Sequence, residues 1–148
     1  MATRAASEHD HPYHQVRWQN FRGFVDTGWI TLKPLTILIG ANSAGKSSVL
    51  SPLLMLNQTL ASRDGVTPLV TRGPLVDAGN FRDIIHCGDI SRTLHLGFRF
   101  HVHQGTADTP LWGYPPGVLE IALRAGDAPN QVVLQQLALR DIILRPLL

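Results

Sequence analysis

The sequence contains very little cysteine and no long apolar run, and each absence excludes a class of protein. Cys87 is the single cysteine in 148 residues, so no intramolecular disulfide can form. The longest apolar stretches are interrupted by Lys, Arg or Pro well before the ~20 residues that a bilayer span requires. The residues after Met1 lack the apolar core of a signal peptide. We therefore expect a cytoplasmic protein with no membrane partner.

Charge is also scarce, and its two signs nearly balance. The chain has 13 Lys and Arg residues against 11 Asp and Glu residues, a net charge of +2. Phosphate-backbone binding usually needs basic side chains clustered on one face, so nucleic acid is allowed as a partner but is not indicated. The 44% hydrophobic content and the length suit one ordinary domain, which excludes two complete domains.

The first segment of the chain differs from the rest. Residues 1–14 have almost no apolar pattern, so we expect a flexible N-terminus there and one folded unit over 15–148. Three histidines lie close together in the first segment, but a His tract without structural constraint predicts no metal site.

Two other clusters could carry chemistry. His95, His101 and His103 share one strand parity, which would place three imidazoles on one sheet face. No cysteine or carboxylate completes the four ligands of a structural zinc site, so we expect a plain surface. Cys87 follows His86, but nothing in the sequence orients the pair, and we expect a buried or half-buried thiol there.

Three short strands are expected in the first part of the folded unit. Residues 16–21 alternate, and residues 28–32 follow the turn-forming Asp-Thr-Gly. Residues 35–39, Leu-Thr-Ile-Leu-Ile, form a continuous apolar run between Pro34 and Gly40. Because continuous apolar character is typical of a strand buried on both faces, we expect this third strand to be central.

A helix is expected at 46–62, which carries no charge after its first residue. Four apolar residues recur in it at helical spacing: Val49, Leu53, Leu56 and Leu60. We therefore expect a helix surrounded by core. Pro52 removes a backbone donor, and we expect a kink or irregularity there that costs ~3 kcal/mol unless packing compensates. Beyond residue 63, short alternating segments separated by turn residues predict half-solvated antiparallel strands.

The strongest motif lies between the third expected strand and the helix. It matches G-x-x-x-x-G-K-[ST], with the residues Gly40, Ala41, Asn42, Ser43, Ala44, Gly45, Lys46 and Ser47. In such a loop the glycines let backbone amides and the helix N-terminus surround phosphate oxygens. A turn that binds no ligand is the alternative, but a lysine at the positive end of a helix has no evident structural purpose.

Each polar side chain of this loop has an expected role. Lys46 would reach the β and γ phosphates, which makes it the predicted catalytic residue. The Ser47 hydroxyl would bind Mg²⁺, and Ser48 would contact the α-phosphate side. We therefore predict ATP and Mg²⁺ as the bound cofactors.

Residues 19–50 resemble the opening of a known group of enzymes. Asn20, Phe21 and Arg22 lead into a hairpin, and Asn42 occupies the third loop position. The segment is similar to ABC-like ATPases of the structural-maintenance-of-chromosomes, recombination-protein-F and OLD type. Those begin with an Asn-Phe-[Arg/Lys] strand and carry the loop G-x-N-x-x-G-K-S-[ST].

A second segment narrows the resemblance. Residues 75–89, followed by Thr-Leu-His-Leu-Gly-Phe-Arg-Phe, look like the part after the P-loop helix in bacterial AAA-family ATPases of poorly defined role. The resemblance covers residues 16 to about 100. It departs at Pro52, where the family usually has a helix former, and at Ala78, where it usually has Leu.

The resemblance implies an α/β P-loop NTPase fold, namely the N-lobe of an ABC-like head. A mixed sheet would surround the P-loop helix, with an antiparallel β subdomain beside it. ATP would lie between two heads, which implies a homo- or hetero-oligomer through the ATPase heads. Arg22 is similar in position to a basic residue near the nucleotide, and a solvated arginine at a strand end is the alternative.

The acids that hydrolysis needs in this family are missing. They are an Asp-Glu pair that ends an apolar strand, together with a signature loop from the opposite head. Asp77 follows Leu-Val, Glu120 follows Val-Leu and Asp141 follows Leu-Ala-Leu-Arg, but none belongs to such a pair. We therefore expect an incomplete N-terminal part of a larger or split ATPase, which binds ATP and does not hydrolyse it alone. Enzymatic activity and a nucleic-acid target would depend on the full system.

Two other functions fit the motif less well. A small P-loop phosphotransferase would have its loop near the start of the chain, followed by alternating parallel strands and helices. A non-catalytic partner-binding fragment of a split ATPase would use the apolar end of the chain, Asp-Ile-Ile-Leu-Arg-Pro-Leu-Leu. Both remain open on the sequence alone.

Overall fold

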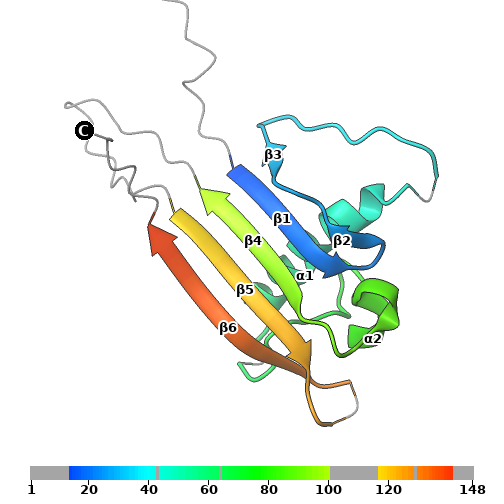
Figure 1. Ribbon diagram of the computed structural model, residues 1–148, viewed down its shortest axis with the longest axis vertical. Coiled ribbons are helices and arrows are strands. Elements are labelled where there is room, and N and C mark those ends of the chain that lie inside the picture. Colours follow the sequence, from blue (N-terminus) through cyan, green and yellow to red (C-terminus); the bar gives the residue numbers. More distant parts are fainter. Residues whose placement is uncertain (1–13, 43, 64, 101–116, 129, 142–148) are drawn as a thin grey trace, which may run out of the picture.

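The computed structural model describes residues 14–42, 44–63, 65–100, 117–128 and 130–141. In chain order the elements are β1 (His14–Phe21), β2 (Phe24–Asp26), β3 (Ile30–Leu32), α1 (Lys46–Ala61), α2 (Phe81–Ile84), the 3-10 turn η1 (His86–Gly88), β4 (Leu94–Phe100), β5 (Gly117–Ala125) and β6 (Val132–Asp141) (Figure 1). The expected helix is confirmed, as are strands close to the first two that were expected. Residues 1–13 of the expected flexible N-terminus lie outside the described residues, whereas His14 begins β1. His101 and His103, which were expected on one sheet face with His95, also lie outside them.

The strands form one six-stranded sheet in the order β2-β1-β4-β5-β6, with β3 also paired to β1. Every pairing between the described strands is antiparallel. The prediction of a mixed sheet is therefore wrong for this part of the chain, although the broader α/β class is confirmed. Parallel neighbours need crossover connections, and the described residues contain one helix long enough to serve as one.

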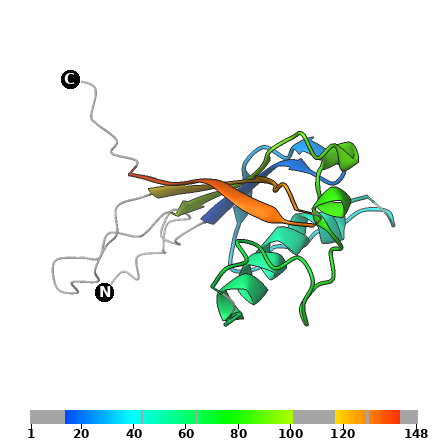
Figure 2. The ribbon, with the colours of Figure 1, turned by 90° about the horizontal axis from the view of Figure 1, so that it is seen from below.

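The helix α1 and the loop that follows it lie on one face of this sheet, and the short helix α2 lies at one end of it (Figure 2). Alternate residues of β1 and β4 point into the core on that side, where Val16 and Trp18 lie directly opposite Phe98 and Leu96. Met55 of α1 packs into the same cluster. The face turned away from α1 is polar, as expected for an antiparallel sheet with one side in water.

Trp18 attaches α1 to the sheet. Its side chain is fully buried, and its indole Nε1–H donates to the Val49 carbonyl oxygen at 2.9 Å. The ring also meets Phe98 edge to face at 5.4 Å between centroids. One side chain therefore supplies apolar contact and a directional bond to the first turns of α1.

The third expected strand does not form. Residues 35–39 have no strand pairing and are largely exposed, with Ile39 91% exposed. A central strand needs hydrogen-bonding neighbours on both sides, and none of the described strands pairs with this segment. The apolar run therefore remains uncovered in the described part of the chain.

The helix α1 is also less enclosed than its composition predicts. Its buried residues are Ser51, Pro52, Met55 and Gln58, on one face. Of the four apolar positions expected in the core, Leu60 is 86% exposed and the other three are half-buried. The helix continues through Pro52 without a break, with the proline ring packed in the core.

We predict that Trp18→Phe destabilises the fold by about 1–3 kcal/mol, because it removes a buried hydrogen bond and leaves unfilled volume beside α1. Urea unfolding followed by circular dichroism measures the change. Trp29→Phe is the matched control, since Trp29 is half-buried on the open face of the sheet. Equal losses in the two variants would contradict an anchoring role for Trp18.

The Arg17–Asp26 ion pair in the β1–β2 hairpin should make the stability of the fold depend on pH. The Arg17 guanidinium bonds both carboxylate oxygens of Asp26 and, with the Gly28 N–H, holds the Asp26 pKa well below its ordinary value. Because the pKa of Asp26 is lower in the folded state than its unfolded value of ~3.9, the ionised carboxylate stabilises the fold at pH values above ~3.9. This contribution is lost as the pH falls toward the folded-state pKa.

Asp26→Asn should therefore cost about 0.5–1 kcal/mol at pH 7, the range of an exposed ion pair, and less at pH 3. Urea midpoints at both pH values measure the difference. A double-mutant cycle with Arg17→Gln isolates the pair. A loss that is the same at both pH values would show that the ion pair is not its source.

Candidate functional site

The expected phosphate loop leads directly into the N-terminus of α1. The helix begins at Lys46, and Gly45 before it has φ 88° and ψ 8°, a left-handed conformation that suits glycine. Within the loop, the Ala44 N–H donates to the Ala41 carbonyl oxygen at 3.2 Å. Ser43 lies outside the described residues. The first turn of α1 carries no acidic residue, so no neighbouring carboxylate in that turn neutralises its positive end.

Lys46 folds back across the loop. Its Nζ donates to the carbonyl oxygens of Gly40 and Ala41, at 2.7 and 2.6 Å. The loop residues Gly40, Ala41, Asn42 and Ala44 are exposed around it. The ammonium group is therefore held inside the curve of the loop, beside the helix N-terminus and open to solvent.

The two serines that follow differ in their surroundings. Ser47 is exposed and Ser48 is half-buried. The Ser47 carbonyl accepts a bond from the Ser51 hydroxyl at 2.7 Å, one turn along α1. Both serines therefore lie in the first turn of α1, directly after the loop.

Arg22 lies against the same helix. Its Nη1 contacts the Ser51 Oγ at 3.4 Å, and its guanidinium lies 5.5 Å from the Phe21 ring centroid. The backbone is held on the other side, where the Arg22 N–H donates to the Ile84 carbonyl oxygen at 2.7 Å. Arg22 therefore approaches the loop helix from the end of β1, one helical turn beyond Ser47.

Phe24 is a contact that sequence reasoning missed. A Cβ atom at Gly45 would lie 2.9 Å from the Phe24 Cζ, so the aromatic ring packs directly on the glycine. Phe24, the first residue of β2, therefore packs against the end of the loop. No local pattern signals this contact, because the two residues meet only after the hairpin folds over α1.

His86 and Cys87 also differ from expectation. His86 Nδ1 lies 2.7 Å from the Arg22 carbonyl oxygen, which can only accept, so Nδ1 carries the proton. His86 Nε2 then faces the Cys87 sulfur at 3.3 Å. The expectation that nothing orients this pair is wrong, and so is that of a buried or half-buried thiol, because Cys87 is exposed.

A hollow of about 400 Å³ borders the loop. It lies between α1, the ends of β1 and β3, and the unpaired segment 36–38, with Lys46 and Ser47 on its rim. Its lining is mainly aliphatic, including Leu50 and Leu53 of α1. The expected phosphate loop therefore lies beside an apolar recess.

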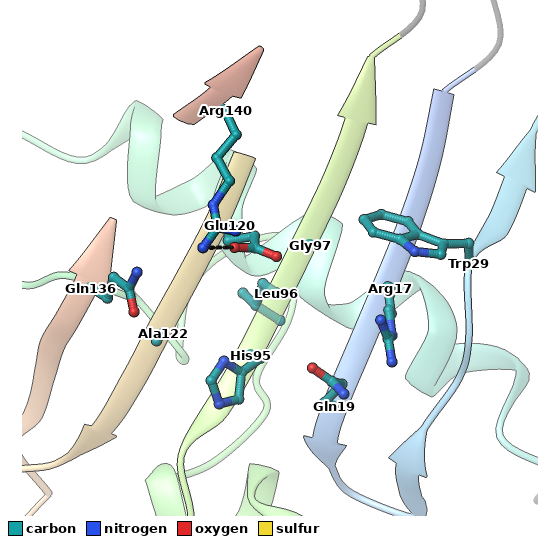
Figure 3. Close-up of a pocket in the computed structure, with 10 residues that line it drawn as sticks. All are labelled: Arg17, Gln19, Trp29, His95, Leu96, Gly97, Glu120, Ala122, Gln136 and Arg140. Carbon is teal, nitrogen blue, oxygen red and sulfur yellow. Dashed lines mark ion pairs between the residues drawn. The ribbon is translucent and has the colours of Figure 1, made fainter. Parts of the chain in front are cut away.

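A second hollow, of about 240 Å³, lies on the opposite, polar face of the sheet (Figure 3). Its basic side chains are already paired: Arg17 with Asp26, and Arg140 with Glu120 at 3.3 Å. Trp29 packs over Gly97 at its edge. These pairings leave little free positive charge to bind an anion.

The described residues contain no group of three or more His, Cys, Asp or Glu side chains that could hold a metal. The predicted Mg²⁺ site does not need one, since Ser47 and phosphate oxygens would supply its protein and nucleotide ligands. None of the described helices is long and apolar enough to cross a membrane.

Comparison of the chain with protein-family models, with curated proteins and with solved structures found no match. The resemblance to ABC-like ATPases therefore remains a prediction from the motif and its context. The arrangement around Lys46 is the structural observation that bears on it.

We predict that Gly45→Ala destabilises the protein by about 1–3 kcal/mol, because alanine is strained at this positive φ and its Cβ meets Phe24. Gly23→Ala is the matched control, since a Cβ there has nothing within 4 Å. Chemical unfolding of both variants measures the difference. A Gly45→Ala protein as stable as Gly23→Ala would show that the loop does not hold this conformation.

Proposed function

We propose that residues 40–48 bind the phosphates of Mg-ATP. The observation that carries the proposal is the position of Lys46, whose ammonium lies within the curve of the loop at the start of a 16-residue helix. Two neutral carbonyls hold it there. Phosphate oxygens carry negative charge, so they add a direct attraction between opposite charges that the carbonyls do not supply, and a nucleotide can replace these contacts favourably.

The neighbouring groups suit the remaining charges of the ligand. The N-terminus of α1 favours an anion, and the exposed Ser47 hydroxyl can complete the coordination of a Mg²⁺ ion bound to the phosphates. Ser48 would contact the α-phosphate side. Arg22, which contacts Ser51 one turn further along α1, would supply a second cation near the loop.

ATP hydrolysis by this chain alone is not part of the proposal. The sequence has no Asp-Glu pair to bind Mg²⁺ and activate water. The segment 35–39 is apolar and largely exposed, and Leu50, Leu54 and Leu60 of α1 are exposed too. Because apolar surface of this kind is usually covered, it supports an incomplete ATPase head that a further chain or domain would complete. The cytoplasm, where ATP is abundant, is the compartment that this function requires.

The runner-up, a small phosphotransferase, has less support. Its core would consist of parallel strands joined by helices, whereas the described sheet is antiparallel throughout. The ATPase head would also need parallel strands beside its loop, and under our proposal a further chain or domain would supply them.

We predict that a fluorescent ATP analogue binds the chain in the presence of Mg²⁺ and that Lys46→Ala weakens binding about 10- to 100-fold, the loss expected from charge-assisted hydrogen bonds. Fluorescence anisotropy measures the affinity. Lys33→Ala is the matched control: it removes the other lysine of the chain, which is exposed outside the loop.

Folding of each variant is checked by circular dichroism. Equal affinities of Lys46→Ala and the unaltered protein would refute the phosphate site. Phosphate release from ATP that depends on Lys46 would instead refute the claim that the chain cannot hydrolyse it alone.

A further inference from the structure

The strand β6 forms an open edge of the sheet. It pairs with β5 on one side, and none of the described residues pairs with its outer side (Figure 1). Its ten residues make it the longest described strand, whereas β2 and β3 at the other end have three residues each. A long unpaired edge presents a row of backbone donors and acceptors that another strand can satisfy.

The side chains of β6 show that its core-side face is uncovered. In one row across the sheet, Trp18 lies opposite Leu96, Leu96 opposite Ile121, and Ile121 opposite Leu137. The first two are fully buried and Leu137 is 62% exposed. In the next row Val16 is buried, while Leu139 on β6 is 73% exposed. The covering layer of α1 and its loops therefore ends before β6 (Figure 2).

Proteins usually protect such an edge with charge, proline or a short strand. The stretch from Val132 to Leu139 has none of these, with Val and Leu residues and no charged side chain before Arg140. A β-bulge interrupts the pairing with β5 between Ala122 and Leu123. Beyond it, Gln136–Asp141 pairs with β5 in regular register, so no further irregularity interrupts this part of the edge.

We propose that β6 pairs antiparallel with β6 of a second copy of this chain, joining the two sheets edge to edge. The sequence of the strand selects the register. With Ala138 opposite Ala138 of the second copy, Leu137 lies opposite Leu139 and Gln136 lies opposite Arg140. Apolar residues then meet on the core-side face, and polar residues meet on the other face.

Neighbouring registers are less complementary. Centring the pair on Leu137 places Leu139 opposite Gln135, and centring it on Leu139 places Leu137 opposite Asp141. The register on Ala138 avoids both mismatches and brings no like charges together. Arg140 can keep its ion pair with Glu120 on its own sheet while its guanidinium also reaches the Gln136 amide of the second copy.

This self-complementarity favours a second copy over an unrelated strand. The interface is independent of the proposed nucleotide site, because β6 lies beyond β5 and α1 begins on the far side of β1. Association should therefore occur without nucleotide.

The first test is the mass of the full chain in solution. Size-exclusion chromatography with light scattering, at micromolar concentration and without nucleotide, should give twice the monomer mass. Leu139→Lys should return it to the monomer mass by placing an unpaired charge in the interface. Val25→Lys is the control, because Val25 is an exposed apolar residue on the opposite edge strand, β2.

The second test measures the register. In a Cys87→Ser background, Ala138→Cys should form an intermolecular disulfide, because residues directly opposite lie within the reach of a disulfide. Gln136→Cys should not, since its two copies would be about 13 Å apart along the strands. Both cysteine variants replace side chains outside the core, so neither should prevent folding.

Doubled mass that is lost in Leu139→Lys and kept in Val25→Lys, with cross-linking at residue 138 only, supports the proposal. It is overturned by a monomer, by a dimer that needs nucleotide, by equal effects of the two lysine variants, or by cross-linking at residue 136 instead.

Discussion

The attachment of α1 to the sheet through Trp18 is the contact on which the remaining structure depends. The indole is fully buried between the strands and the helix, and its N–H bonds the Val49 carbonyl oxygen close to the start of α1. Burial of so large a ring positions the helix across β1 and β4, and the hydrogen bond determines its rotation. The N-terminus of α1, and with it Lys46, is thereby placed beside the β1–β2 hairpin.

That placement explains why the loop has its shape. Phe24 of the hairpin packs on Gly45, the residue that adopts a positive φ and lets the chain turn into the helix. Arg22 approaches α1 from the same hairpin and bonds Ser51. Its backbone carbonyl also accepts from His86, so the segment after α2 is connected to the same place. Residues distant in sequence thus assemble around one helix end, where positive charge is concentrated.

Much of this arrangement follows from local pattern, and some does not. The helix over residues 46–61 and the alternating strands were predictable, because their periodicity depends on neighbouring residues alone. The segment 35–39 was predicted to be a buried strand and is exposed instead. An apolar run shows that a strand is compatible with the sequence, but a strand forms only where other strands offer hydrogen-bonding partners. Phe24 and the oriented His86 had no sequence signal for the same reason.

The sequence by itself determined the glycine-rich loop, the lysine at its end, the helix that follows and the lack of a paired acid. These features depend on residue type at fixed spacing along the chain. Tertiary structure alone decided the order of the strands in the sheet, the bonds of Lys46 to the loop carbonyls and the open edge at β6. Those features depend on which distant segments meet, because backbone groups and apolar surfaces are satisfied by partners in space.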